Sequence, residues 1–186
     1  MGRTEPSAKI RLIQTAQSLF KRQGYDGTGL TQILTESGAP KGSFYHHFPG
    51  GKEALAEAVI AGAGEEVRAF AAACFAETDG FEEGAVRLVN AVADWFEASG
   101  YAEGCPITSI LLAAVPGSPM LLQSSRDGLE SWISTAETAA QRDDIDDPRD
   151  AALALVGGLE GAWVLARALR SRAPFDAVVS QIGRLR

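Results

Sequence analysis

The chain has 186 residues, of which 46% are apolar and 22% are charged, and its formal net charge is −7. This composition predicts a soluble globular protein with a buried core, built as one domain or as one domain with a small appendage. It argues against a membrane protein, because no uninterrupted apolar run approaches the roughly 18 residues of a membrane-spanning helix. No apolar signal region follows the polar start, so we expect a cytoplasmic protein. Cys74 and Cys105 have no CxxC or histidine partner, which excludes a disulfide framework and a predicted metal site.

The charge is unevenly distributed along the chain. Residues 1–52 hold seven lysine and arginine residues against three acidic residues, a net charge of +4, which leaves −11 for the remaining 134 residues. Attraction to phosphate is local and is screened beyond about 8 Å at physiological salt. The asymmetry therefore favours a small nucleic-acid-binding module joined to an acidic body, with a chance distribution as the alternative.

The first predicted helix begins at Thr4 or Ser7 and ends at Gln23. Gly24 follows it, as a glycine often follows the C-terminus of a helix. Apolar residues recur in this segment at helical spacing, which predicts one buried face. These residues are Ile10, Ile13, Ala16, Leu19 and Phe20.

The next segment, residues 28–40, predicts a short helix followed by a tight turn. We expect Thr28 to cap a helix whose inward residues are Leu30, Ile33 and Leu34. Gly38 suits a positive φ at the end of that helix, and Pro40 suits the start of another.

A second short helix is predicted from about Lys41 to His47. Its outward faces carry cationic, hydroxyl and aromatic side chains, while Phe44 and Phe48 share one side and anchor the helix to a core. Two short helices joined by a glycine-containing turn favour a helix-turn-helix that reads the DNA major groove. The first helix and this pair predict a three-helix unit closed by Tyr25 and Phe48.

A fourth helix is predicted from Lys52 to about Ala76, after a turn at residues 49–51. At about 1.5 Å per residue it would span roughly 35 Å. Its first turn is therefore expected beside the DNA-facing module and its end in the acidic body. Further helices are predicted over about residues 81–98, 107–114, 119–142, 148–170 and 174–185, with stops at Gly100 and Pro116 and the last helix in register to Leu185. No stretch alternates with period two, which predicts an all-α fold.

The last two predicted helices are candidates for a dimer interface. The helix from Pro148 has an apolar side with several glycines, which would let another helix approach closely. The apolar sides of both helices must be buried against a partner. The alternative is packing inside one chain. The predicted interface residues are Leu155, Gly158, Leu159, Ala162, Ala166, Leu169, Val178, Val179 and Ile182.

Residues 28–55 resemble the signature of the TetR family of transcriptional regulators. The resemblance combines the short first helix, the turn glycine Gly38, the aromatic-rich segment 44–48 and the opening of the fourth helix at residues 52–55. Residues 47–52, 104–106 and 159–167 further resemble the LmrA/YxaF-like subgroup. Two residues depart from the family pattern: Leu34 stands where a small residue is usual, and Pro40 stands where serine or threonine is common.

The resemblance implies about nine helices, with a helix-turn-helix DNA-binding domain over residues 1–52 and a ligand-sensing and dimerising domain over residues 53–186. It also implies repression of transcription that a small molecule relieves. The expected partners are double-stranded operator DNA, a small-molecule effector and a second copy of the chain, with no membrane, no cofactor and no enzymatic activity.

The predicted DNA contacts lie mainly in the second short helix. Lys41, Ser43 and His46 are expected at base edges, because residues early in a recognition helix enter the groove. Gly42 would let the backbone approach closely. Phosphate contacts are predicted for Thr28, Tyr45, His47 and Lys52. A solvated polar face is the alternative for any one of them, and His47 has the alternative of packing inward.

Metal binding and catalysis are poorly supported by the sequence. His46 and His47 are adjacent and so point about 100° apart on a helix, without a further ligand at i+4. Cys105 has no histidine outside the recognition helix to activate it as a nucleophile. We therefore predict no metal site and no catalytic residue.

Large apolar residues of the acidic body are the candidates for an effector site. Each has core packing as its alternative, and the resemblance to ligand sensors is what makes some of them pocket walls. Few charged groups share their faces, which predicts an apolar or aromatic effector. The candidates are Phe70, Trp95, Phe96, Ile110, Met120, Trp132 and Trp163.

Two functions thus remain to be separated. The first is a ligand-responsive, dimeric DNA-binding repressor with a palindromic operator. The second is an all-helical small-molecule-binding protein or enzyme that does not engage DNA. Salt-dependent binding to DNA, and its loss when Lys41 and Lys52 lose their charge, would discriminate between them.

Overall fold

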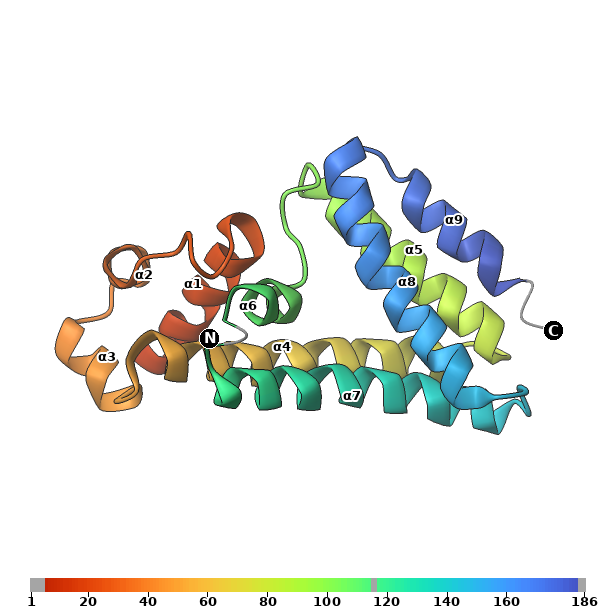
Figure 1. Ribbon diagram of the computed structural model, residues 1–186, viewed down its shortest axis with the longest axis horizontal. Coiled ribbons are helices and arrows are strands. Elements are labelled where there is room, and N and C mark those ends of the chain that lie inside the picture. Colours follow the sequence, from red (N-terminus) through yellow and green to blue (C-terminus); the bar gives the residue numbers. More distant parts are fainter. Residues whose placement is uncertain (1–5, 115–116, 184–186) are drawn as a thin grey trace, which may run out of the picture. The chain divides into compact units, whose positions relative to one another are not determined.

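The computed structural model describes residues 6–114 and 117–183, and within these ranges the chain forms nine helices and no strand (Figure 1). The predicted all-α fold with about nine helices is confirmed. Thr4, Pro116 and Leu185, which figured in the predicted helix boundaries, lie outside the described residues. The helices are α1 (Ala8–Gln23), α2 (Leu30–Ser37), α3 (Lys41–His47), α4 (Gly51–Ala76), α5 (Phe81–Ala98), α6 (Pro106–Ala114), α7 (Pro119–Arg142), α8 (Pro148–Leu169) and α9 (Ala173–Ile182).

The helices form two compact units. Unit 1 comprises Met1–Ala63 and Pro106–Arg126, and unit 2 comprises Gly64–Cys105 and Asp127–Arg186. Unit 1 thus combines the N-terminal helices with α6 and the first turns of α7, which follow much later in the chain. Helices α4 and α7 each contribute residues to both units.

Helix α1 forms the centre of unit 1, where it contacts α2, α3 and α6. The Ser7 hydroxyl caps its start by accepting from the Ile10 N–H at 3.4 Å, and Gly24 ends it with a φ of 81°. Leu12 is fully buried, whereas Ile10 is 46% exposed. The predicted inward position of Ile10 is therefore wrong, because the buried stripe of α1 starts at Leu12 and continues through Ala16, Leu19 and Phe20.

The two short helices follow the predicted order, with one correction at the start of α2. The N-cap of α2 is Gly29 and not Thr28, because the Thr28 side chain is buried and its hydroxyl donates to the Gly24 carbonyl at 2.7 Å. Gly38 ends α2 in the left-handed conformation at φ 62°, as predicted. Pro40 is the N-cap of α3, so the predicted proline start is also confirmed.

Two serines from later in the chain link the N-terminal helices to α6 and α7. The Ser109 hydroxyl on α6 donates to the Phe20 carbonyl in the last turn of α1 at 3.1 Å. Ser118 accepts from the Leu121 N–H at 3.2 Å and so caps the start of α7, and its hydroxyl also donates to the carboxylate of Glu53 on α4. The first turn of α4 is thereby joined to the first turn of α7.

In unit 2, α5, α8 and α9 pack side by side (Figure 1). Phe96 and Phe175 are buried between them, with ring centroids 6.1 Å apart. Arg172, just before α9, donates to Asn90 of α5 at 2.8 Å and pairs with the carboxylates of Asp94 and Asp176. Apolar packing and one guanidinium thus hold α9 on α5.

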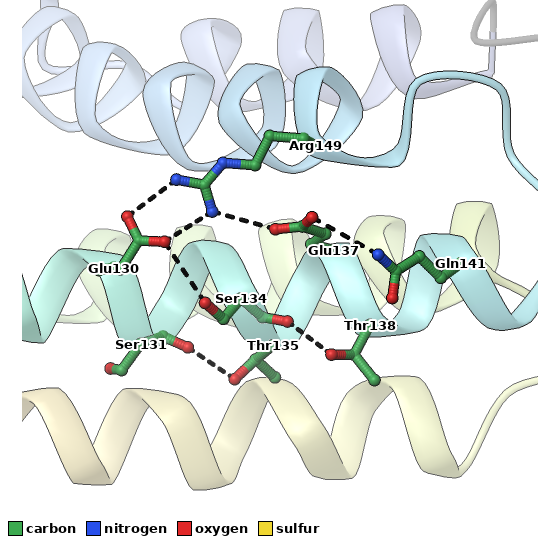
Figure 2. A network of polar contacts seen from close by, with 8 residues as sticks. All are labelled: Glu130, Ser131, Ser134, Thr135, Glu137, Thr138, Gln141 and Arg149. Carbon is green, nitrogen blue, oxygen red and sulfur yellow. Dashed lines mark hydrogen bonds and ion pairs between the residues drawn. The ribbon is translucent and has the colours of Figure 1, made fainter.

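A polar network joins α7 to α8 in unit 2 (Figure 2). The guanidinium of Arg149 on α8 donates to Glu130 of α7 at 2.6 and 2.9 Å and to Glu137 of α7 at 3.0 Å. These charged hydrogen bonds raise the pKa of Arg149 and lower the pKa of Glu130. The three side chains are partly exposed, so solvent screens the network and its contribution to stability is modest.

Helix α8 is apolar on two sides. Its mean hydropathy over 18 residues is 1.5, so by length and composition alone it would suit a membrane span. Uninterrupted apolar runs in the sequence do not reveal this property. One side of α8 packs against α9 and α5, and Val164 and Leu165 on another side are 61% and 55% exposed.

Candidate nucleic-acid interface

Helix α3 presents the predicted reading groups to solvent. Lys41, Gly42 and His46 are exposed, Ser43 and His47 are partly exposed, and Tyr45 is 46% exposed. The same helix turns Phe44 inward, where the side chain is completely buried. A helix of seven residues cannot persist on its own intrinsic stability, so its outward groups are positioned by this buried anchor.

Aromatic contacts fix the anchor of α3. The ring centroids of Phe44 and Phe48 lie 5.7 Å apart, and those of Phe44 and Tyr45 lie 5.1 Å apart with edge-to-face geometry. Phe48 is the C-cap of α3, and its backbone N–H donates to the Phe44 carbonyl at 2.8 Å. The predicted closure of the N-terminal unit by Phe48 is confirmed by the burial of its side chain.

The N-terminal end of α3 offers an open backbone. A Cβ placed on Gly42 would have no described atom within 4 Å, apart from the residues next to it in sequence and the backbone of its own helix. Pro40 provides no side-chain cap, so the first N–H groups of α3 remain directed out of the helix. A DNA backbone or base edge can therefore approach Gly42 closely without displacing protein atoms.

Thr28 and Lys52 are placed differently from the other predicted contacts. The Thr28 hydroxyl is buried in its bond to Gly24 and is not at the surface for a phosphate. The ammonium of Lys52 donates to the Tyr25 carbonyl at 2.7 Å and lies 4.0 Å from the centroid of the Tyr25 ring. Burial lowers the pKa of Lys52, while the carboxylate of Asp26 opposes that effect.

The histidines and cysteines occupy separate environments. The rings of His46 and His47 lie 5.1 Å apart on α3. Within residues 6–114 and 117–183, no group of three or more His, Cys, Asp or Glu residues has an arrangement that would hold a metal ion. Cys74 and Cys105 are buried free thiols, and burial raises the pKa of Cys74. A raised pKa makes this thiol less reactive.

The predicted effector residues fall in both units. Ile110 is buried and Met120 exposed in unit 1, while Phe70 is exposed in unit 2. The indole N–H of Trp132 donates to the Gly64 carbonyl at 2.9 Å, which makes this residue part of the packed core. The remaining three residues, Trp95, Phe96 and Trp163, are brought together by α5 and α8.

This aromatic cluster contains an unsatisfied donor. The Trp163 ring lies 6.3 Å from Trp95 and 6.5 Å from Phe96, in both cases edge to face. Trp163 is only 9% exposed, and its indole N–H has no hydrogen-bond partner among the described residues. Leaving a buried donor unpaired costs about 1–3 kcal/mol, so the cluster has a polar group ready for an acceptor.

Most of the predicted dimer residues are buried inside one chain. Val178 packs against Gly158, and a Cβ at Gly158 would lie 3.3 Å from the Val178 side chain. Gly158 and Val178 are themselves partly exposed, and Leu169 is 64% exposed. The predicted residues with buried side chains are Leu155, Leu159, Ala162, Ala166 and Ile182, and Val179 is partly exposed. The apolar side of α8 chosen from the sequence is thus largely the side that packs on α9, and Gly157, Gly161, Val164 and Leu165 mark another side that is exposed.

Tyr25, Ser109 and Ser118 are linking residues of unit 1 that the sequence did not indicate. Tyr25 was expected only to close the core, whereas its backbone carbonyl and ring both bind Lys52. Ser109 and Ser118 contact residues 89 and 65 positions away along the chain. No local pattern signals such pairs, because they depend on how distant helices pack.

Unit 1 contains a helix-turn-helix whose second helix is anchored by the buried Phe44, and the chain continues into a second helical unit. This arrangement is typical of a two-part helical DNA-binding regulator. Family comparison makes this assignment specific. Residues 12–59 match the model of the bacterial regulatory proteins of the tetR family, and residues 82–181 match the C-terminal domain of LmrA/YxaF-like transcriptional regulators. The chain belongs to the TetR family, as its sequence signature predicted. Since proteins of this family are transcriptional regulators, the chain is a regulator and not an enzyme.

Individual relatives agree with this assignment. The chain is 31% identical over 177 residues to the HTH-type transcriptional regulator LmrA of Bacillus subtilis, covering 94% of each chain. Its fold is similar to that of reduced NemR from E. coli, with a TM-score of 0.85 at 20% identity and 95% coverage of each chain. It is also similar to CifR, solved with a 26 bp double-strand operator DNA, with a TM-score of 0.79 at 21% identity and coverage of 99% and 98%.

Proposed function

We propose that the protein is a homodimeric repressor that binds a palindromic operator and releases it when a small apolar or aromatic molecule binds unit 2. We further propose that it acts in the cytoplasm, where its DNA is. The observation that carries the DNA-binding part is the exposed face of α3, which presents Lys41, Tyr45 and His46 on a helix held by the buried Phe44. Family membership supports repression as the outcome of binding.

DNA contact is assigned to the groups that the fold leaves outward. Lys41, Ser43 and His46 are proposed at base edges, with Gly42 allowing close approach, while Tyr45 and His47 contact phosphates. In a dimer two copies of α3 would enter successive major grooves about 34 Å apart. This geometry requires a two-fold symmetric operator.

A gel-shift titration with the DNA upstream of the chain's own coding region tests this proposal. Lys41→Met should weaken binding and relax the preference for the base that Lys41 contacts, since base-edge contacts carry sequence specificity. Gly42→Ala should weaken binding while leaving the fold intact, because a Cβ meets no described side chain there. If the wild type shows no salt-dependent binding to any such fragment, a small-molecule-binding protein that does not engage DNA is the better description.

Dimerisation is assigned to the exposed apolar side of α8. Val164, Leu165 and Leu169 are more than half exposed, and the open glycines Gly157 and Gly161 allow a second helix to approach closely. A copy of the same surface is the partner we propose, because a palindromic operator needs a two-fold dimer. Helix α9 would take part through its partly exposed Val179.

Light scattering at micromolar concentration decides the oligomeric state. The wild type should have the mass of a dimer, and Val164→Glu should give a monomer because it places a charge within the interface. Asp150→Ala provides a control, since this exposed position lies outside the apolar side. A monomeric wild type would remove the basis for a palindromic operator.

Effector binding is assigned to the cluster of Trp95, Phe96 and Trp163. The unpaired indole N–H of Trp163 suits an aromatic molecule that carries a hydrogen-bond acceptor. We therefore expect effectors of this kind to raise the melting temperature, since a ligand that binds only the folded state stabilises it. No shift across a panel of hydrophobic drugs and aromatic metabolites would contradict the assignment.

Trp163→Phe sharpens the effector test. This substitution keeps an aromatic ring but removes the donor, so the gain from removing an unpaired N–H should offset part of the cost of the lost indole packing. The shift produced by an acceptor-bearing effector should become smaller. Trp132→Phe is the matched control, because its N–H is already bonded to Gly64, and its loss should lower stability without a specific effect on the effector.

A further inference from the structure

Helix α2 ends at the turn of the helix-turn-helix without a cation of its own. Its last turn contains no basic residue, and Glu36 places an acidic group there. The last carbonyls of a helix have no partner within the helix and carry a partial negative charge. A short helix of this kind therefore gains stability from a cation that another part of the chain supplies.

Arg11 on α1 supplies that cation. Its Nε–H donates to the carbonyl of Ser37, the last residue of α2, at 3.1 Å. Its Nη1 group donates to the Pro6 carbonyl, just before α1, at 2.8 Å. The backbone of this residue is itself fixed, because the Arg11 N–H donates to the Ser7 carbonyl at 3.0 Å and the neighbouring Leu12 is fully buried. One planar guanidinium thus binds carbonyls from two separate segments.

Ser37 also organises the turn that leads into α3. It is 6% exposed, and its hydroxyl accepts from the Ala39 N–H at 3.3 Å. Gly38 follows Ser37 in the left-handed conformation, and Pro40 is the N-cap of α3. Arg11 therefore binds the residue at which the chain leaves α2 and turns toward α3.

We propose that Arg11 is a positioning residue for base reading, which fixes the turn between α2 and α3 and so determines where the first residues of α3 lie in the major groove. The proposal rests on the proposed DNA-binding function and identifies what holds its reading helix. Phe44 anchors the middle of α3, whereas Lys41 and Ser43 directly follow the turn. A displaced start of α3 should weaken hydrogen bonds to base edges, which carry the sequence information, while attraction to phosphates remains.

Three variants of α1 in the full-length chain provide a matched test. Arg11→Met removes the guanidinium and keeps an apolar stem, while Arg11→Lys retains a cation that can donate to the Ser37 carbonyl. Lys9→Met removes a charge from an exposed position two residues earlier on the same helix. The guanidinium of Arg11 has further N–H donors, so a phosphate contact is the competing role that the test must separate.

The ratio of specific to non-specific DNA affinity forms the first measurement. The upstream DNA fragment is compared with a scrambled fragment of the same length and base composition. Arg11→Met should lower this ratio about tenfold with little change in non-specific affinity, and Arg11→Lys should restore part of it. Lys9→Met should keep the wild-type ratio, because a loss of attraction to phosphate weakens both forms of binding alike. An unchanged ratio in Arg11→Met, or an equal loss of both affinities, would overturn the proposal.

Amide hydrogen exchange without DNA forms the second measurement. The Ala39 N–H should exchange about tenfold faster in Arg11→Met and at the wild-type rate in Lys9→Met, because only Arg11 binds the turn. The Gly24 N–H, which donates to the Phe20 carbonyl at the other end of α1, should keep its wild-type rate. An unchanged rate at Ala39, or an equal increase at Gly24 through general destabilisation, would contradict the positioning role. This measurement needs no DNA, so it separates failure of the positioning role from failure of the proposed function.

Discussion

Adjacent residues of α3 should separate folding from DNA binding. Phe44 is completely buried, so Phe44→Ala should destabilise the protein by about 3–5 kcal/mol, the usual cost of removing a buried phenylalanine side chain. Each kcal/mol corresponds to about 2–4 °C for a chain of this size. The thermal midpoint, followed by circular dichroism, should therefore fall by about 6–20 °C.

Tyr45 is the matched control for this experiment. It is 46% exposed, and its ring makes an edge-to-face pair with Phe44, an interaction worth about 0.5–1.5 kcal/mol. Tyr45→Ala should therefore lower the midpoint only slightly, yet weaken operator binding at a temperature where both variants are folded. Equal destabilisation by the two substitutions would refute the assignment of Phe44 as the anchor and Tyr45 as an outward contact.

Two further perturbations test the packing at Gly84 on α5 and the ion pair between α7 and α8. A Cβ at Gly84 would lie 2.5 Å from the Phe75 ring, so Gly84→Ala should destabilise the protein by about 1–3 kcal/mol. Gly62→Ala is the matched control, because a Cβ there makes no such contact, and it should leave stability unchanged or raise it by up to about 1 kcal/mol. Denaturant titration compares the two variants. Arg149 lowers the pKa of Glu130, so the stability from this pair is present at neutral pH and is lost as pH falls through that lowered pKa. Arg149→Met should flatten this part of the pH dependence of the melting temperature, and an identical pH profile would contradict the role of the pair.

The helix-turn-helix was predictable because its signals are local. Gly38 must adopt a positive φ at the end of α2, Pro40 fits the start of α3, and the spacing of Phe44 and Phe48 places both on one side of the chain. Each of these effects acts within a few residues. The sequence alone therefore predicts which face of α3 points outward.

Other assignments failed where the local pattern allowed two answers. Thr28 is a good capping residue, but its hydroxyl donates a hydrogen bond to the Gly24 carbonyl. Gly29 therefore occupies the N-cap position of α2. Helix α8 has two apolar sides, and periodicity cannot tell which of them packs on α9. Leu155 and Ala166 are consequently buried within the chain, while Val164 and Leu165 are exposed.

By itself the sequence determined the all-α class, the order of the helices, the helix-turn-helix and its family, since these follow from periodicity, caps and a short signature. The tertiary structure decided which polar side chains already have partners within the chain. Lys52 reads in the sequence as a free cation at a helix start, but its ammonium binds Tyr25. Ser109 reads as an ordinary polar residue, but it joins α6 to the end of α1. Such contacts form between residues that are far apart in the sequence and meet only in the folded chain. Local sequence patterns therefore do not predict them.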